Sequence, residues 1–169
     1  MSDSGVYRVM LADDHPILRA GVKVLIESKP GLKVTGEASN GQELLDLLAK
    51  SPCDMVILDL NMPIMNGIEV LEYMQIHFPR VAVLVLTTHK EIPFLKRALS
   101  KGARGYLLKE ETHDKLLSGI NDIRQGKRVI SAEMTSLIVE DYSTDLSSPL
   151  TADLLTQREK EILNLTANG

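Results

Sequence analysis

The feature that most restricts the fold is a fivefold alternation of strand and helix signals between residues 7 and 125. Short runs of β-branched and other apolar residues predict strands, and each run is followed by apolar residues at helical spacing. The strands are expected at Tyr7–Ala12, Leu32–Ala38, Met55–Asp59, Val81–Leu86 and Arg104–Lys109. Strands that alternate with helices form parallel sheets with right-handed crossovers and helices on both faces. We therefore predict an α/β fold with a doubly wound parallel sheet.

The predicted strands differ in how completely they are covered. Met55–Asp59 and Val81–Leu86 are almost continuously apolar, which is typical of strands packed on both faces. Leu32–Ala38 alternates apolar and polar residues, which indicates one face in contact with water. Met55–Asp59 and Val81–Leu86 therefore belong at the centre of the sheet, and Leu32–Ala38 belongs at an edge.

The segment after the fifth predicted helix has a different pattern. A short helix is predicted with Met134 and Ile138 facing inward, followed by linker composition at residues 143–149. Thr156–Glu159 has the form of a capping box at the start of an amphipathic helix. The predicted parts are a domain over 1–126, a linker with a short helix over 127–150, and a helical appendage over 151–169.

Composition narrows the functions that the chain can have. Apolar residues make up 44% and charged residues 25%, as in folded globular proteins. No apolar run approaches the roughly 18 residues that span a bilayer, and the N-terminus does not resemble a signal peptide, so we expect a cytoplasmic protein without membrane contact. A formal net charge of -4 argues against nucleic-acid binding by this chain alone. Cys53 is the only cysteine, so no internal disulfide forms.

Acidic residues follow two of the predicted strands. Asp13 and Asp14 end the first strand, and Asp59 ends the third. Ligand sites of open parallel sheets form at the carboxyl ends of the strands, so neighbouring strands would bring these carboxylates into one pocket. Such carboxylates repel one another unless protons or a cation lie between them. An oxygen-only ligand set favours Mg²⁺ or Mn²⁺ over zinc, so we predict a divalent cation there.

Two further side chains are expected at the same edge of the sheet. Lys109 ends the fifth strand and would supply a fixed positive charge, and Thr87 ends the fourth and would supply a hydroxyl. A cation, a carboxylate, a lysine and a hydroxyl around one point suit phosphoryl transfer to an aspartate. Asp59 is the expected nucleophile, and the turn at Asn66-Gly67 would leave space beside it.

Four motifs lie at these strand ends in a fixed order: Leu11–Pro16, Leu58–Pro63, Leu86–Thr88 and Gly105–Lys109. With them, the chain resembles the receiver domains of response regulators, specifically the NarL/FixJ group, from residue 7 to about residue 125. The resemblance implies a flavodoxin-like (βα)5 sheet with strand order 2-1-3-4-5.

The resemblance also implies a role for each acidic residue. Asp59 would accept a phosphoryl group from the histidine of a sensor kinase. Magnesium would be held by Asp14, Asp59 and the main-chain carbonyl of Asn61, and Asp13 would orient waters on the metal. The chain would be a phosphoacceptor, not an enzyme that acts on other substrates.

The remaining motif residues are implied to stabilise the phosphoryl group and to respond to it. Lys109, Thr87 and Thr88 would contact the phosphoryl group, and Thr87 and Tyr106 would change position. A phosphoryl group adds about 1.5 to 2 negative charges, which can shift the balance between two states of one fold. Glu110 departs from the family pattern, which often has proline here, and its charge would weaken the hold of Lys109.

Residues 155–163 resemble the first helix of a LuxR-type helix-turn-helix. In that family a later recognition helix enters the major groove of DNA, and the sequence ends before it. The implied partners are a sensor histidine kinase, a second copy of the chain on activation, and DNA through a complete effector domain. The implied function is transcription regulation controlled by phosphorylation.

Three other functions are weighed against this one. A receiver acting by protein contact without phosphorylation is disfavoured by the acidic pair and Lys109. A phosphatase with an aspartyl-phosphate intermediate commonly needs a carboxylate two residues after the nucleophile, where this chain has Asn61. A flavin or nucleotide binder would need a glycine-rich loop after the first strand, which the sequence lacks. The histidines have no ligand spacing and are assigned no chemistry: His15, His77, His89 and His113.

Overall fold

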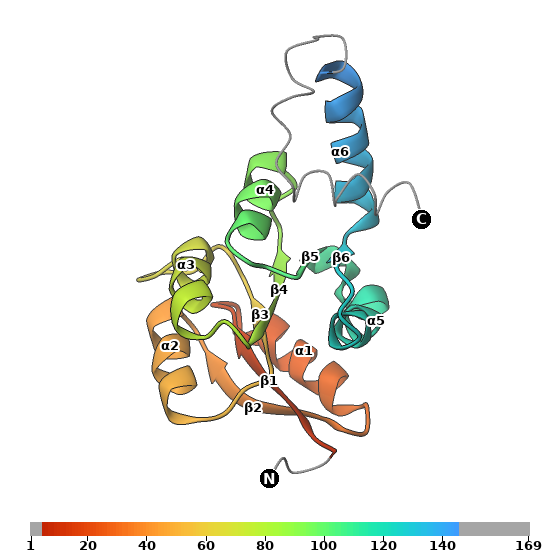
Figure 1. Cartoon of the computed structure of the whole chain (residues 1–169). Helices are drawn as coiled ribbons and strands as arrows, with labels where there is room; N and C mark the ends of the chain where they lie inside the picture. The colour runs from red at the N-terminus through yellow and green to blue at the C-terminus, as the bar shows by residue number, and fades with distance from the viewer. Residues whose placement is uncertain (1–4, 146–169) are drawn as a thin grey trace.

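The computed structural model describes residues 5–145 (Figure 1). In chain order the elements are β1 (Tyr7–Ala12), α1 (Pro16–Glu27), β2 (Leu32–Ala38), α2 (Gly41–Lys50), β3 (Met55–Leu58), α3 (Gly67–His77), β4 (Ala82–Thr87), α4 (Ile92–Ser100), β5 (Gly105–Leu108), the 3-10 turn η1 (Lys109–Glu111), α5 (Thr112–Arg124), β6 (Val129–Ile130) and α6 (Ala132–Asp145). The predicted alternation of strands and helices is confirmed across all five units.

The strands form one parallel sheet in the order β2-β1-β3-β4-β5-β6. The order predicted for the first five strands is confirmed, with β2 at an edge and β3 and β4 in the centre. The prediction of a five-stranded sheet is corrected by β6, which pairs with Gly105 and Tyr106 of β5. A strand of two residues is too short to show a hydrophobic period, so the sequence carries no signal for it.

Helices cover both faces of the sheet (Figure 1). Alternate residues of a strand face opposite sides, so β1 contributes Met10 and Ala12 to one core and Val9 and Leu11 to the other. The first core is closed by α2, α3, α4 and α6, and the second by α1 and α5. This two-sided burial fixes the register of β1 and therefore the position of the residues that follow it.

Local signals start the helices near the predicted residues. The side chain of Asn40 caps α2 by accepting the N–H of Glu43 at 2.9 Å. Pro16 occupies the first turn of α1, where its missing N–H has no intrahelical partner to lose. These caps set where the loops at the carboxyl edge of the sheet end.

Helix α6 packs beside α4 on the first core. The predicted inward residues Met134 and Ile138 are 0% and 2% exposed. Lys96 of α4 lies 3.9 Å from Asp141 and 5.5 Å from the centre of the Tyr142 ring. The predicted linker at 127–150 therefore begins with two elements, β6 and α6, that pack onto the sheet. The predicted appendage at 151–169 lies outside the described residues.

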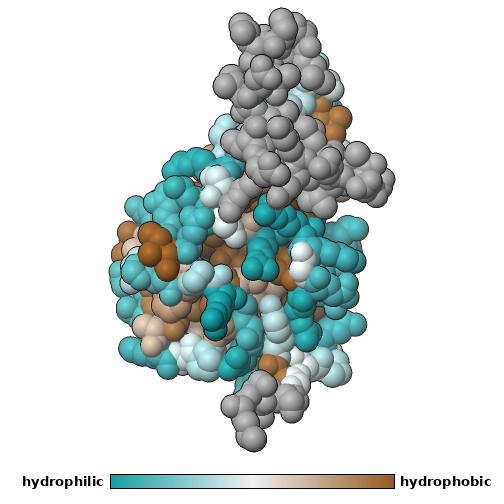
Figure 2. Space-filling view, viewed as in Figure 1, coloured by the Kyte–Doolittle hydropathy of each residue, from teal (hydrophilic) through white to brown (hydrophobic). Residues whose placement is uncertain are grey.

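The described surface is mostly hydrophilic in the view of Figure 2, with apolar residues in separate patches. Within residues 5–145, no helix is both long enough and apolar enough to cross a bilayer.

Candidate functional site

The register of the sheet places the predicted site residues at one edge. Ala12 of β1 pairs with Leu58 of β3, so Asp13 and Asp59, which follow them, are neighbours. The N–H of Asp59 donates to the carbonyl of Ala12 at 2.9 Å, which extends this pairing by one step. On the other side of the site, Leu108 ends β5 and Lys109 follows it.

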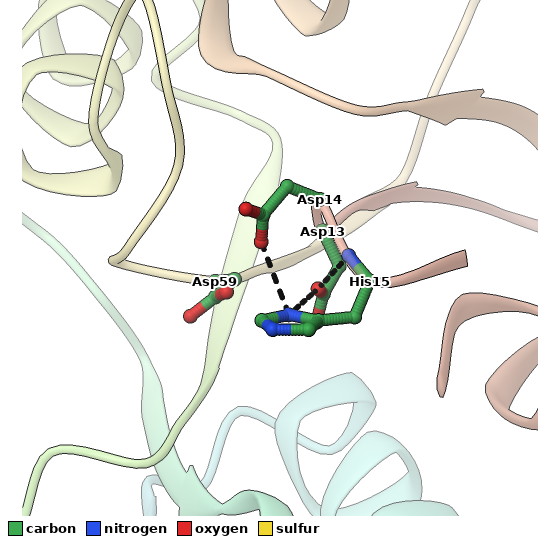
Figure 3. A group of neighbouring side chains, drawn as sticks. All are labelled: Asp13, Asp14, His15 and Asp59. Carbon is green, nitrogen blue, oxygen red and sulfur yellow. Dashed lines mark hydrogen bonds and ion pairs between the residues drawn. The ribbon is translucent and has the colours of Figure 1, made fainter. Parts of the chain in front are cut away.

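The three predicted carboxylates meet in one pocket (Figure 3). Oxygen atoms of Asp13, Asp14 and Asp59 and a ring nitrogen of His15 all lie within 4.8 Å of one another. Asp59 is 2% exposed and Asp13 is 7% exposed, whereas Asp14 is more open to solvent. Carboxylates so close together and so little hydrated require positive charge nearby.

Lys109 supplies the first of these positive charges. Its Nζ lies 2.8 Å from Oδ2 of Asp13 and 2.9 Å from Oδ2 of Asp59. Burial disfavours the ammonium, but hydrogen bonds with the two carboxylates outweigh it and raise the pKa of Lys109 above its usual value. Burial also raises the pKa of Asp59, although Lys109 acts in the opposite direction. The phosphoacceptor candidate is thus a poorly solvated carboxylate held by one lysine.

His15 lies inside the cluster, although its sequence context suggests only a surface or capping role. Its Nδ1 is 3.0 Å from Oδ1 of Asp13 and 3.0 Å from Oδ1 of Asp14 (Figure 3). The same nitrogen is 3.3 Å from Nζ of Lys109. The available signal was adjacency, because His15 directly follows the acidic pair and its N–H donates to Asp13 at 2.8 Å.

The pocket fits a hard divalent cation. Oδ1 of Asp14 is buried and accepts no hydrogen bond from residues 5–145. The nearest ring nitrogen, Nδ1 of His15, lies 3.0 Å from it as an ion-pair contact. A buried carboxylate oxygen without a donor, next to two more carboxylates, matches the all-oxygen ligand sets of Mg²⁺. Asp14 and Asp59 would hold the ion, and Asp13 would orient waters on it. Asn61 lies next to them, since its N–H donates to Oδ1 of Asp59 at 3.2 Å.

A tight loop closes the pocket beside Asp59. Asn66 caps α3 by accepting the N–H of Glu69, whose carboxylate accepts the N–H of Asn66 in return. At Gly67 a Cβ atom would lie 2.4 Å from the carbonyl oxygen of Asp59, so only glycine allows this approach. The turn predicted at Asn66-Gly67 therefore lies against the phosphoacceptor candidate.

The two predicted switch residues are linked through His89. Thr87 is fully buried and its Oγ1 accepts the N–H of His89 at 3.2 Å. Tyr106 is also fully buried, and its hydroxyl donates to the carbonyl of His89 at 2.9 Å. Burial raises the pKa of Tyr106, so the hydroxyl stays protonated as the donor. Thr88 is exposed, and its side chain makes no hydrogen bond to any residue within 5–145.

Comparisons with known proteins agree with this geometry. A family model described as the response regulator receiver domain matches residues 9–121. The nitrate/nitrite response regulator protein NarL of Escherichia coli (strain K12) is 37% identical over 172 residues, which span 100% of this chain and 79% of that protein. The chain belongs to the NarL/FixJ group of response regulators.

Solved structures give the same result for this response regulator. A two-component response regulator of the LuxR family from Aurantimonas sp. SI85-9A1 superposes with a TM-score of 0.78 at 33% identity, covering 82% of this chain and 99% of that one. A structure of two RcsB dimers bound to two parallel DNAs superposes with a TM-score of 0.76 at 28% identity, covering 97% of this chain and 78% of that one. The flavodoxin-like receiver fold is thereby confirmed.

One residue of this receiver departs from the family pattern without disturbing the lysine. Every peptide bond within residues 5–145 is trans, including the one between Lys109 and Glu110. Glu110 is exposed, and its carboxylate lies 2.7 Å from Nζ of Lys90. Lys90 also lies 3.1 Å from Glu133 of α6. The expectation that Glu110 weakens the contact of Lys109 with the site is not supported, because the Glu110 carboxylate pairs with Lys90 and Nζ of Lys109 lies 2.9 Å from Asp59.

Proposed function

We propose that Asp59 accepts a phosphoryl group from the phosphohistidine of a sensor kinase. The observation that carries this proposal is the contact of 2.9 Å between Asp59 and Lys109, beside two more carboxylates. A single lysine cannot neutralise three carboxylates, and the excess negative charge fits a site that works with a divalent cation. Mg²⁺ in this pocket would neutralise phosphoryl oxygens during transfer.

The transfer step uses atoms that the site already orients. A carboxylate oxygen of Asp59 attacks phosphorus, the phosphorus–nitrogen bond of the phosphohistidine breaks, and the kinase imidazole leaves with the electron pair. Oδ1 of Asp59 accepts the Asn61 N–H, and Oδ2 faces Lys109, so the carboxylate is held in one orientation. Lys109 then pairs with the new phosphoryl oxygens in place of the carboxylate oxygen.

The new charge acts on the segment between β4 and α4. Thr87 would rotate toward the phosphoryl group, and its Oγ1 would no longer accept the N–H of His89. The carbonyl of His89 accepts the Tyr106 hydroxyl, so a movement of this segment reaches Tyr106 as well. His89 also stacks on Phe94 of α4 with ring centres 4.0 Å apart. Phosphorylation would therefore reshape the face formed by α4 and β5 as a shift between two states.

This face is proposed to control a DNA-binding effector domain. The relatives of the chain include transcriptional regulators, and one matching structure contains RcsB dimers on DNA. We propose the same partners here: a sensor histidine kinase, a second copy of the chain on activation, and DNA through the effector domain. The chain is proposed to act in the cytoplasm, as a phosphoacceptor and not as an enzyme on other substrates.

Intact-mass spectrometry tests the proposal. The chain is incubated with acetyl phosphate and Mg²⁺, in parallel with Asp59→Asn and with Asp54→Asn as a matched control at the opposite edge of the sheet. We expect one phosphoryl gain in the wild type and in Asp54→Asn, and none in Asp59→Asn. Equal labelling of Asp59→Asn would place the acceptor elsewhere and overturn the proposal.

A further inference from the structure

A cleft with a volume of about 370 Å³ opens at the amino ends of β4 and β5, the edge opposite Asp59. Its lining comes from the end of α3, the turn between α4 and β5, and the turn between α5 and β6. The apolar part of the lining that a ligand can reach comes from Phe78, Pro79 and Val81, with Leu71, Met74 and Val83 buried beneath them. This volume falls in the range of about 300 to 1,000 Å³ that is typical of small-molecule sites.

The rim of the cleft is basic. Four cationic side chains line it: Lys101, Arg104, Lys127 and Arg128. Lys101 is paired with Glu72 at 3.2 Å. The side chains of Arg104 and Lys127 make no ion pair or hydrogen bond to any residue within 5–145, and both residues are exposed. The chain as a whole has a net charge of -4, so this concentration of positive charge runs against its composition.

An apolar surface at Phe78, beside the side chains of Arg104 and Lys127, fits one class of ligand. A purely apolar molecule would leave the cations without partners, and a simple inorganic anion would leave the floor exposed. A flat polyanion would meet the rim but not fill the hollow. We propose that the cleft binds a small organic anion, with its apolar body on the Phe78 side and its phosphate or carboxylate at Arg104 and Lys127. This proposal does not depend on phosphoryl transfer at Asp59.

Such a ligand would join two turns that are separate in the sequence. Arg104 follows the turn at Gly102, and Lys127 follows Gly126, and both glycines have positive φ, at 97° and 83°. An anion between Arg104 and Lys127 would tie the start of β5 to the start of β6.

The test is a titration of the chain followed by amide NMR signals. The probes are AMP and salicylate as organic anions, with adenosine and inorganic phosphate as the separate halves of AMP. We expect saturable shifts at Gly102 and Gly126 with at least one organic anion, and at least about tenfold weaker binding of each half. Binding of inorganic phosphate alone with the affinity of AMP, or no saturable binding of either organic anion, overturns the proposal.

Two double variants distinguish binding in the cleft from a general attraction of anions to positive charge on the surface. Arg104→Ala combined with Lys127→Ala is expected to weaken binding at least about fivefold. Lys33→Ala combined with Lys50→Ala removes the same charge from exposed positions away from the cleft and is expected to bind as the wild type does. Equal losses in both double variants would contradict a specific site. Circular dichroism confirms that each variant is folded.

Discussion

Nζ of Lys109 lies 2.9 Å from Oδ2 of Asp59, although 50 residues separate them in the chain. The same ammonium lies 2.8 Å from Oδ2 of Asp13, so one lysine links the carboxyl end of β5 to the carboxyl ends of β1 and β3. Under the proposed function, Lys109 would compete with a cation for the carboxylates before transfer and would stabilise the phosphoryl group after it.

Substitution of Lys109 separates these two effects. In Lys109→Met, phosphoryl gain from acetyl phosphate is expected to slow by more than about tenfold, because no side chain replaces the ammonium at the phosphoryl oxygens. Mg²⁺ is expected to bind more tightly, because the ammonium no longer competes for Asp13 and Asp59. A time course of intact mass measures the rate of phosphoryl gain, and a Mg²⁺ titration measures the affinity for Mg²⁺. Lys115→Met, on an exposed face of α5, should leave both unchanged.

Mg²⁺ should stabilise the folded chain through Asp14. At a Mg²⁺ concentration ten times the dissociation constant, binding to the native state alone adds about 1.4 kcal/mol to the free energy of unfolding. Urea unfolding with and without Mg²⁺ measures this gain. In Asp14→Asn, which removes a carboxylate with an unsatisfied oxygen, the gain should be mostly lost. An undiminished gain in that variant would contradict the assignment of Asp14 as a ligand.

The ion pair between Arg8 and Asp54 predicts a pH dependence of stability. Asp54 accepts from Nε, the second guanidinium nitrogen and the main-chain N–H of Arg8 at 2.8 to 3.0 Å. Hydrogen bonds from Arg8 hold the pKa of Asp54 below its usual value. A lowered folded pKa stabilises the native state above the unfolded pKa of about 3.9, and this stability is lost as pH falls through the folded pKa.

We therefore expect Asp54→Asn to lose about 1 kcal/mol at pH 7, a small value because the Arg8 side chain is 39% exposed. Urea unfolding between about pH 7 and pH 3 should show the wild type and the variant converging at the acid end. Asp46→Asn, an exposed change on α2, should shift stability by less than about 0.5 kcal/mol. A constant difference at all pH values would exclude the charge of Asp54 as the cause.

Helix α6 should contribute to the stability of the receiver. Ile138 is 2% exposed and packs in the first core, so Ile138→Ala is expected to cost about 2 to 4 kcal/mol through lost contacts and a cavity. Val139, the next residue, is 44% exposed, and Val139→Ala should change stability by less than about 0.5 kcal/mol. Chemical unfolding compares them. Equal, small effects would show that residues 132–145 behave as a linker.

The sheet and the acidic cluster could be predicted because they depend on repeated local signals. Ala12 and Leu58 end apolar strands, and the acidic residues follow them directly, so parallel pairing alone brings Asp13 and Asp59 together. Strand β6 could not be predicted, because its two residues show no hydrophobic period and are defined only by their pairing with Gly105 and Tyr106 of β5. In the order predicted for five strands β5 would be the last strand, whereas pairing with Ile130 of β6 places Tyr106 inside the sheet, where it is fully buried.

The place of His15 could not be predicted for a related reason. Adjacency places His15 beside both aspartates, but the approach of its ring to 3.3 Å from Nζ of Lys109 joins residues 94 apart, which strand and helix periods do not encode. The pairing of Glu110 with Lys90 is similar, because it joins two loops that only the folded sheet brings together.

The chemical identity of the phosphorylated residue is the central claim, and reductive trapping tests it most directly. Borohydride converts an aspartyl phosphate to homoserine, so peptide mapping after treatment with acetyl phosphate, Mg²⁺ and borohydride locates the acceptor. We predict homoserine at position 59 and unchanged aspartates at positions 13 and 14. Homoserine at position 13 or 14, or a phosphoryl group retained on His15 with position 59 unmodified, would contradict the account.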